Sequence, residues 1–110
     1  MANAKPFVLP RRVQVGPYSY KLWLDDGLDS ESAYGETDNS KMRIGFSSSH
    51  LCTENHVLVT LVHEIMHAVS YVYEVELSEK DTKRLAHGLT QALQSAGLLP
   101  ERAVLEDGDA

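Results

Sequence analysis

Apolar and polar residues alternate along two segments near the start of the chain, and this spacing predicts β-strands. The first segment begins at Arg11 and the second ends at Leu24. Gly16-Pro17 lies between them and is typical of a tight turn. The apolar positions are Val13, Val15, Tyr18, Tyr20, Leu22 and Leu24. We therefore predict an antiparallel hairpin whose second strand is the longer one.

The next segment, residues 25–40, is rich in Asp, Ser, Gly, Asn and Glu. We expect it to form an exposed loop, with a short helical turn around residues 28–33. Apolar positions then return in alternation at Met42, Ile44 and Phe46, which predicts a third strand over residues 42–47. Together with the hairpin, this strand would complete a small antiparallel sheet of about three strands.

A helical spacing follows, with apolar residues three and four positions apart over residues 54–73. Thr53 is suited to cap the start of this helix, and Glu54 would lie in its first turn. One apolar stripe contains Leu58, Val62, Ile65, Val69 and Val72. Thr60, His63, Glu64 and His67 fall on another side. The helix should therefore bury one face against the sheet and place a second face around these polar side chains.

A second helix is predicted after a connection over residues 74–77. Ser78 followed by Asp81 resembles a capping box at its start, and Gly97 is suited to end it. Its apolar stripe would contain Leu85, Leu89, Ala92, Leu93 and Ala96. The pattern as a whole predicts an α+β fold, in which the small sheet packs on the first helix and the second helix runs antiparallel to the first.

The two ends of the chain lack this periodicity. Residues 1–10 contain Pro6 and Pro10 and are expected to form a flexible lead-in, and residues 98–110 are expected to form an acidic, disordered tail. Residues 11–97 would then form a single domain, which suits a chain of 110 residues.

Composition narrows the functional class. Apolar residues make up 43% and charged residues 24% of the chain, as in globular proteins. A net charge of −6 argues against binding to nucleic acids or to anionic membranes. No segment resembles a signal peptide or a membrane span, and the single cysteine, Cys52, excludes an internal disulfide. These features predict an intracellular protein.

The chemistry of the chain centres on His63, Glu64 and His67, which form a His-Glu-x-x-His motif. Residues four apart on a helix share a face, so both imidazoles can reach one metal ion. Glu64 would stand beside the metal and take a proton from a metal-activated water. Glu64 is also the one charged residue between Val57 and Tyr73. The alternative is a core helix whose histidines form internal hydrogen bonds.

A catalytic zinc normally has three protein ligands, so a third must come from elsewhere in the chain. If the second helix packs antiparallel to the first, six to ten residues of it are needed to return to the level of the histidines, at about 1.5 Å per residue. His87 lies in that window, next to Gly88, and is the predicted third ligand. Glu79 is the main alternative. His56, two turns before His63, is expected to line the wall of the pocket.

Other candidates for the third ligand remain open. They are the acidic residues Glu74, Glu76 and Asp81, together with His50.

These motifs resemble those of zincin metallopeptidases. The HEIMH segment, a short connection and a second helix are similar to the minimal zincin core, and the gap from His67 to His87 is similar to that before the third ligand of gluzincins, where a Glu stands. His87-Gly88 is similar to a His-Gly pair of SprT-like proteases. Over residues 11–97 the chain resembles small phage and prophage metallopeptidases, of the gluzincin-like, SprT-like or ImmA/IrrE-like kind. The shared elements are a Val-x-Val-Gly-x-Tyr hairpin, a Tyr-Gly-Glu loop and the motif helix.

The resemblance implies a zinc peptidase that acts on a protein or peptide substrate in the cytoplasm of a bacterial host. It implies one Zn²⁺ per chain, His63 and His67 as ligands, and Glu64 as general base. A peptide could add to the edge of the 42–47 strand. Tyr34, Tyr71 and Tyr73 are candidates to stabilise the oxyanion, although each could equally be a packing aromatic.

Two other functions compete with the peptidase. The domain could bind zinc as an inactive interaction or inhibitory module, or the zinc could be purely structural.

Overall fold

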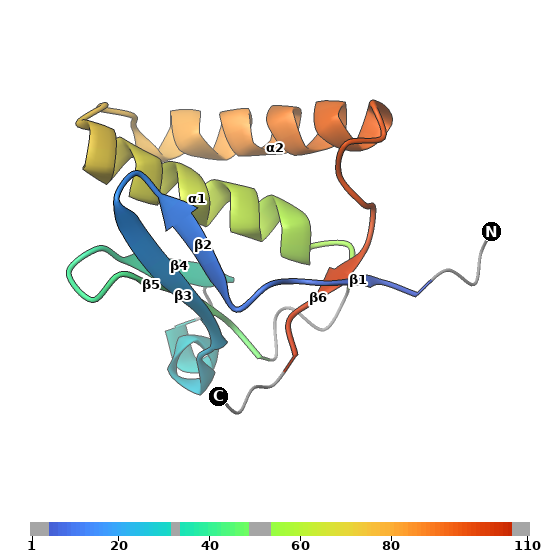
Figure 1. Cartoon of the computed structure of the whole chain (residues 1–110), viewed down its shortest axis with the longest axis horizontal. Helices are drawn as coiled ribbons and strands as arrows, with labels where there is room; N and C mark the ends of the chain where they lie inside the picture. Colours follow the sequence, from blue (N-terminus) through green and yellow to red (C-terminus); the bar gives the residue numbers. More distant parts are fainter. Residues whose placement is uncertain (1–4, 32–33, 49–53, 107–110) are drawn as a thin grey trace.

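The computed structural model describes residues 5–31, 34–48 and 54–106, and the chain has the α+β fold that the sequence predicts. The first helix, α1 (Val57–Tyr73), lies between a four-stranded sheet and the second helix, α2 (Glu79–Ser95), as Figure 1 shows. Among the described residues, neither helix combines the length and apolar character that crossing a membrane requires.

The sheet differs from the predicted one. Its strands are β2 (Arg12–Val15), β3 (Tyr18–Leu24), β4 (Gly35–Asp38) and β5 (Arg43–Phe46), in the order β2-β3-β5-β4. The predicted hairpin is present, because β2 and β3 pair antiparallel. However, β3 and β5 are parallel, so the expected three-stranded antiparallel sheet is wrong.

The parallel pairing follows from the segment that connects β3 and β5. This segment contains a 3-10 helix, η1 (Asp26–Glu31), and β4, which pairs antiparallel with β5 at the edge of the sheet. The composition of residues 25–40, rich in Asp, Ser, Gly, Asn and Glu, predicts a loop, and the Gly-Glu-Thr-Asp sequence of β4 has no apolar alternation. Its strand structure depends instead on backbone pairing with β5, which residue types do not encode.

The turn between β2 and β3 requires a glycine. Gly16 has a φ of +57°, a conformation that side-chain-bearing residues rarely adopt. A Cβ atom added there would lie 2.8 Å from Cγ1 of Val72, so the turn also packs closely against α1. The hairpin is thus positioned directly on the end of the helix that carries the motif.

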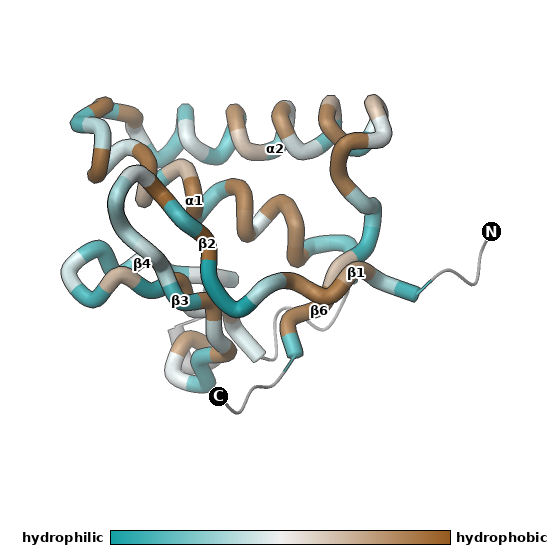
Figure 2. Tube along the Cα trace, in the orientation of Figure 1, coloured by the Kyte–Doolittle hydropathy of each residue, from teal (hydrophilic) through white to brown (hydrophobic). Residues whose placement is uncertain are grey.

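The core lies between the sheet and α1. Tyr20, Ile44 and Phe46 from the strands are fully buried, and α1 contributes Leu58 and Ala68. Of the predicted stripe on α1, Ile65 and Val72 also pack against this core, but Val69 is 38% exposed. Figure 2 shows that most of α1 is apolar, whereas apolar and polar positions alternate along α2.

The start of α1 differs slightly from the prediction. The helix begins at Val57, and His56 precedes it without a capping hydrogen bond from its side chain. Thr53, the predicted cap, lies outside the described residues, as do Cys52 and His50.

The two ends of α2 agree with the sequence, but its buried face does not. The backbone N–H of Asp81 donates to Oγ of Ser78 over 3.0 Å, and Gly97, with a φ of +78°, follows the helix. The buried residues are Thr82, Ala86 and Thr90 rather than the predicted stripe. Leu85 and Leu89 are each 46% exposed. Small side chains face α1, which lets the two helices approach closely.

Residues near both ends of the chain are ordered against each other, contrary to the prediction of a flexible lead-in and a disordered tail. The strands β1 (Phe7–Val8) and β6 (Ala103–Val104) pair in parallel. Leu9 is 5% exposed and Ala103 is fully buried in the core beside the start of α1. These segments are too short to show a periodicity, so the prediction missed them.

Candidate metal centre

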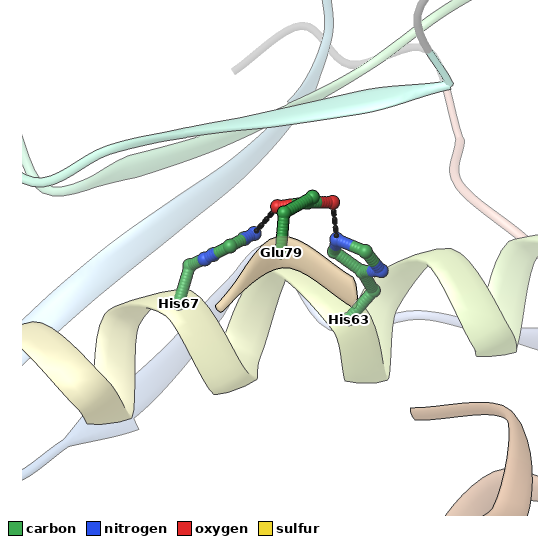
Figure 3. A group of neighbouring side chains, drawn as sticks. All are labelled: His63, His67 and Glu79. Atoms are coloured by element: carbon green, nitrogen blue, oxygen red, sulfur yellow. Dashed lines mark ion pairs between the residues drawn. The ribbon is translucent and has the colours of Figure 1, made fainter. Parts of the chain in front are cut away.

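His63 and His67 lie one turn apart on α1, and their ring centroids are 4.9 Å from each other. Their side chains are 18% and 33% exposed, so each ring is partly enclosed but still reachable. Both rings direct Nε2 toward the same point, as Figure 3 shows. The helical spacing in the sequence therefore produces the pair of nitrogen donors that it predicts.

The carboxylate of Glu79 occupies that point. Its Oε2 lies 2.8 Å from Nε2 of His63, and its Oε1 lies 3.0 Å from Nε2 of His67 (Figure 3). These three residues are the group of potential metal ligands found among the described residues, with donor atoms within 4.8 Å of one another. The structure thus brings Glu79, the alternative in the sequence prediction, to the two histidines.

His87 is not part of this group, and the reason lies in the connection between the helices. After Glu74, residues 75–78 are neither helical nor paired with a strand. An extended residue advances about 3.3 Å, against about 1.5 Å in a helix, so the connection itself covers the return along α1. The prediction assigned that distance to α2. His87 therefore lies about 12 Å further along α2 than Glu79.

The three donors fit a zinc ion. Two imidazole nitrogens and one carboxylate oxygen form a ligand set that catalytic zinc sites use. In a tetrahedral site with bonds near 2.1 Å, ligand atoms are about 3.4 Å apart. The two N–O distances, 2.8 and 3.0 Å, are several tenths of an ångström shorter than that value, and all the donor atoms lie within 4.8 Å of one another, so the side chains would shift to bind the ion.

Glu64 lies beside this group, on the side of α1 that faces β4. It is 6% exposed, and the hydroxyl of Thr37 lies 2.7 Å from its Oε1 and 2.9 Å from its main-chain oxygen. Burial raises the pKa of Glu64 above its ordinary value, while the Thr37 hydrogen bond and the nearby His63 and His67 act against this rise. Glu64 is therefore a carboxylate with an increased affinity for a proton, as a general base requires.

Gly35 allows β4 to lie close to Glu64. A Cβ atom at this position would be 2.9 Å from Cγ2 of Thr60 and 3.2 Å from Cγ of Glu64. A side chain here would therefore push β4 away from α1 or displace Glu64. Gly35 and Thr37 are functional candidates that the sequence prediction missed, because neither belongs to an apolar pattern.

Two adjoining hollows flank the centre. One has a volume of about 470 Å³ and the other of about 370 Å³. Both are lined by Gly35, His63, Glu64 and Glu79. β4 borders both hollows at the edge of the sheet; His63 lines both and His67 lines the smaller one, and we refer to the two hollows together as the groove. This edge belongs to β4, whereas β5, which contains most of the 42–47 segment, is paired on both sides.

The remaining predicted residues take different positions. His56 lines the larger hollow, as predicted, and so do Tyr34 and His87. Tyr71 and Tyr73 are each 60% exposed, and neither lines the two hollows beside the histidines. Tyr34 is therefore the oxyanion candidate that lies nearest to the groove.

Comparisons of the chain with protein-family models, curated proteins and solved structures found no match.

Proposed function

We propose that the protein is a zinc-dependent peptidase in which His63, His67 and Glu79 hold the metal and Glu64 is the general base. The observation that carries this proposal is the convergence of three metal-binding side chains beside a buried carboxylate. The groove on both sides of these residues supplies room for a substrate. The resemblance of residues 11–97 to small phage and prophage metallopeptidases agrees with this function and with action in a bacterial cytoplasm.

When bound, zinc would act as a Lewis acid that polarises the scissile carbonyl and lowers the pKa of water. Glu64 would accept the proton of the attacking water and pass it to the leaving amine. Thr37 would hold the Glu64 carboxylate in place through its hydroxyl, which makes it a positioning residue.

A peptide substrate would lie in extended form along β4. This strand is at the edge of the sheet and borders the hollows, so its unpaired backbone groups can hydrogen-bond to a peptide. The predicted use of the 42–47 segment is replaced by β4, because β5 already pairs with β3 and β4.

Metal analysis by mass spectrometry, on protein purified without a histidine tag, tests the ligand set. We expect about one zinc per chain in the wild type and in His87→Ala, because His87 lies outside the ligand group. We expect zinc to be lost in His63→Ala and Glu79→Ala. Zinc retained in Glu79→Ala but lost in His87→Ala would show that His87, and not Glu79, is the third ligand.

Cleavage of a denatured protein mixture, followed by mass spectrometry, tests the reaction. Glu64→Gln should retain zinc but lose at least about a hundredfold of the activity, since it cannot accept a proton. Unchanged cleavage by Glu64→Gln would contradict the role of Glu64 as general base.

A structural zinc is the second candidate, and it is favoured by the fact that the three ligands join α1 to α2. Structural zinc sites are usually closed by four protein ligands, however, whereas the group found among the described residues has three and adjoins a groove. If chelation unfolds the protein and Glu64→Gln has no effect on any activity, the structural function is correct.

A further inference from the structure

The larger hollow extends from the candidate metal centre along α2. Glu79, Lys83 and His87 line it from this helix, each four residues from the next. Residues four apart lie on one face of a helix, with Cβ atoms about 6 Å apart. Val59 of α1 also lines the hollow. The hollow thus contains His63, Glu64 and Glu79 of the candidate centre, and the ammonium group of Lys83 lies one helical turn of α2 from Glu79.

Lys83 does not pair with the glutamate that precedes it by one helical turn. A glutamate four residues before a lysine commonly pairs with it on a helix, but both carboxylate oxygens of Glu79 face the histidines instead. The other acid that lines the hollow, Glu64, is buried against Thr37. Within the described ranges, no carboxylate forms an ion pair with Lys83.

Without a metal ion, Glu64 and Glu79 together outweigh the charge of Lys83 in the hollow, and binding of a divalent cation would reverse this balance. The two negative charges of Glu64 and Glu79 would neutralise a divalent cation. Lys83 would then be an excess positive charge in the hollow. The chain as a whole has a net charge of −6, so a cationic pocket is contrary to its general character. Such a pocket attracts an anion from solution, and in a peptide the available anion is a carboxylate.

We propose that Lys83 binds a carboxylate of the substrate peptide, located one or two residues from the bond that is cut. This inference rests on the proposed peptidase function. The distance follows from the spacing of Glu79 and Lys83, because an extended peptide advances about 3.3 Å per residue. The carboxylate could belong to an acidic side chain or to the C-terminus of the peptide, and both would present the same group to the ammonium.

Peptide binding tests the proposal without relying on turnover. The zinc-loaded Glu64→Gln protein is titrated, with NMR detection, with acetyl-Ala-Ala-Glu-Ala-Ala-amide, with its Gln counterpart, and with acetyl-tetra-alanine that has a free C-terminus. We expect a carboxylate peptide to bind about tenfold more tightly than the Gln peptide, as for one charge-assisted contact. The peptide that shows this preference identifies the source of the carboxylate.

Two further variants assign the effect to its residue. Lys83→Ala should abolish the preference. Arg84→Ala should retain it, because Arg84 is an exposed cation on the same helix that does not line the hollow. A preference that survives in Lys83→Ala would locate the carboxylate on the metal, and equal binding or no binding of all three peptides would leave no carboxylate site. Either result would overturn the proposal.

The fate of the same peptides in wild-type protein separates this inference from the proposed function. Cleavage without a carboxylate preference would support the peptidase and reject the role of Lys83. A preference that depends on Lys83, without zinc uptake or cleavage, would keep the carboxylate site and reject the peptidase.

Discussion

Glu79 contacts both histidines, yet its own side chain is 69% exposed. An exposed ion pair contributes about 0–1 kcal/mol to stability, because water competes with it. The group is therefore expected to matter for metal binding much more than for folding. This separation makes Glu79 a suitable residue for testing the site.

We expect Glu79→Gln to change the free energy of unfolding of the metal-free protein by about 1 kcal/mol or less. Zinc affinity should fall by at least about tenfold, because a neutral amide is a poorer ligand than a carboxylate. Urea denaturation in the presence of a chelator and competitive zinc titration measure the two quantities. Glu76→Gln, in the exposed connection, is the matched control and should change neither. Unaltered zinc affinity in Glu79→Gln would exclude it as a ligand.

Glu64 gives the metal-free protein a pH-dependent stability. Its pKa is raised in the folded state from an ordinary value of 4.5, mainly by burial. Above about pH 4.5, the folded protein therefore retains a proton that the unfolded chain has released, and this contribution to stability decreases as the pH rises through the folded pKa. In Glu64→Gln the side chain does not titrate, so the variant does not lose stability in this way as the pH rises. Its stability relative to the wild type should increase as the pH rises above about 4.5, as urea denaturation at a series of pH values would measure. A constant difference would contradict a raised pKa.

The residues of the site differ in how far the sequence reveals them. His63, Glu64 and His67 are separated by helical spacing alone, so their common location on α1 could be predicted. Thr37 and Glu79 reach the site from other elements, and their positions depend on the path of the chain between elements. The sequence argument favours His87 because it assigns the whole return along α1 to the second helix and none of it to the connection.

At the scale of elements, the edge strand β4 depends on its close approach to α1. Gly35 permits this approach, since a Cβ there would contact Thr60 and Glu64 at 2.9 and 3.2 Å. We expect Gly35→Ala to lower the free energy of unfolding by about 1–3 kcal/mol, as for overpacked sites. Because Glu64 would be displaced, the variant should also have a lower activity in the cleavage assay.

Gly88→Ala is the matched control for this substitution. It is the same chemical change, but a Cβ at Gly88 would meet no atom within 4 Å, and the position lies inside α2. Alanine there should raise stability by up to about 1 kcal/mol, because it favours the helix. Equal effects of the two substitutions would show that the close approach of β4 is unimportant.

The two helices could be predicted from their periodicity, but the orientation of α2 could not. Its pattern of leucines indicated Leu85 and Leu89 as the buried stripe, whereas Thr82 and Ala86 face α1. Apolar periodicity identifies the more hydrophobic side of a helix. Contact between two closely packed helices depends instead on side-chain size, and small residues satisfy it here.

At the scale of the whole molecule, β1 and β6 cover the start of α1. Ala103 is fully buried, and its backbone N–H donates to the main-chain oxygen of Glu54 over 3.2 Å. We expect Ala103→Asp to lower the free energy of unfolding by about 2 kcal/mol or more, because it buries a charge without a partner. The exposed Glu101→Ala should change it by less than about 0.5 kcal/mol. Thermal denaturation of both variants measures these changes in stability. Similar midpoints for the two variants would show that the 103–104 segment is dispensable for stability.

The connection over residues 74–78 has a consequence for how the chain can vary in length. Exposed loops ordinarily accept inserted or deleted residues, because little depends on their path. Here the connection sets where α2 begins, and Glu79 is its first residue, bonded to both histidines of α1. One residue more or fewer would move that carboxylate by about 3 Å, too far for it to reach both imidazoles. A surface loop of this protein should therefore be as intolerant of insertions and deletions as its core is of new side chains.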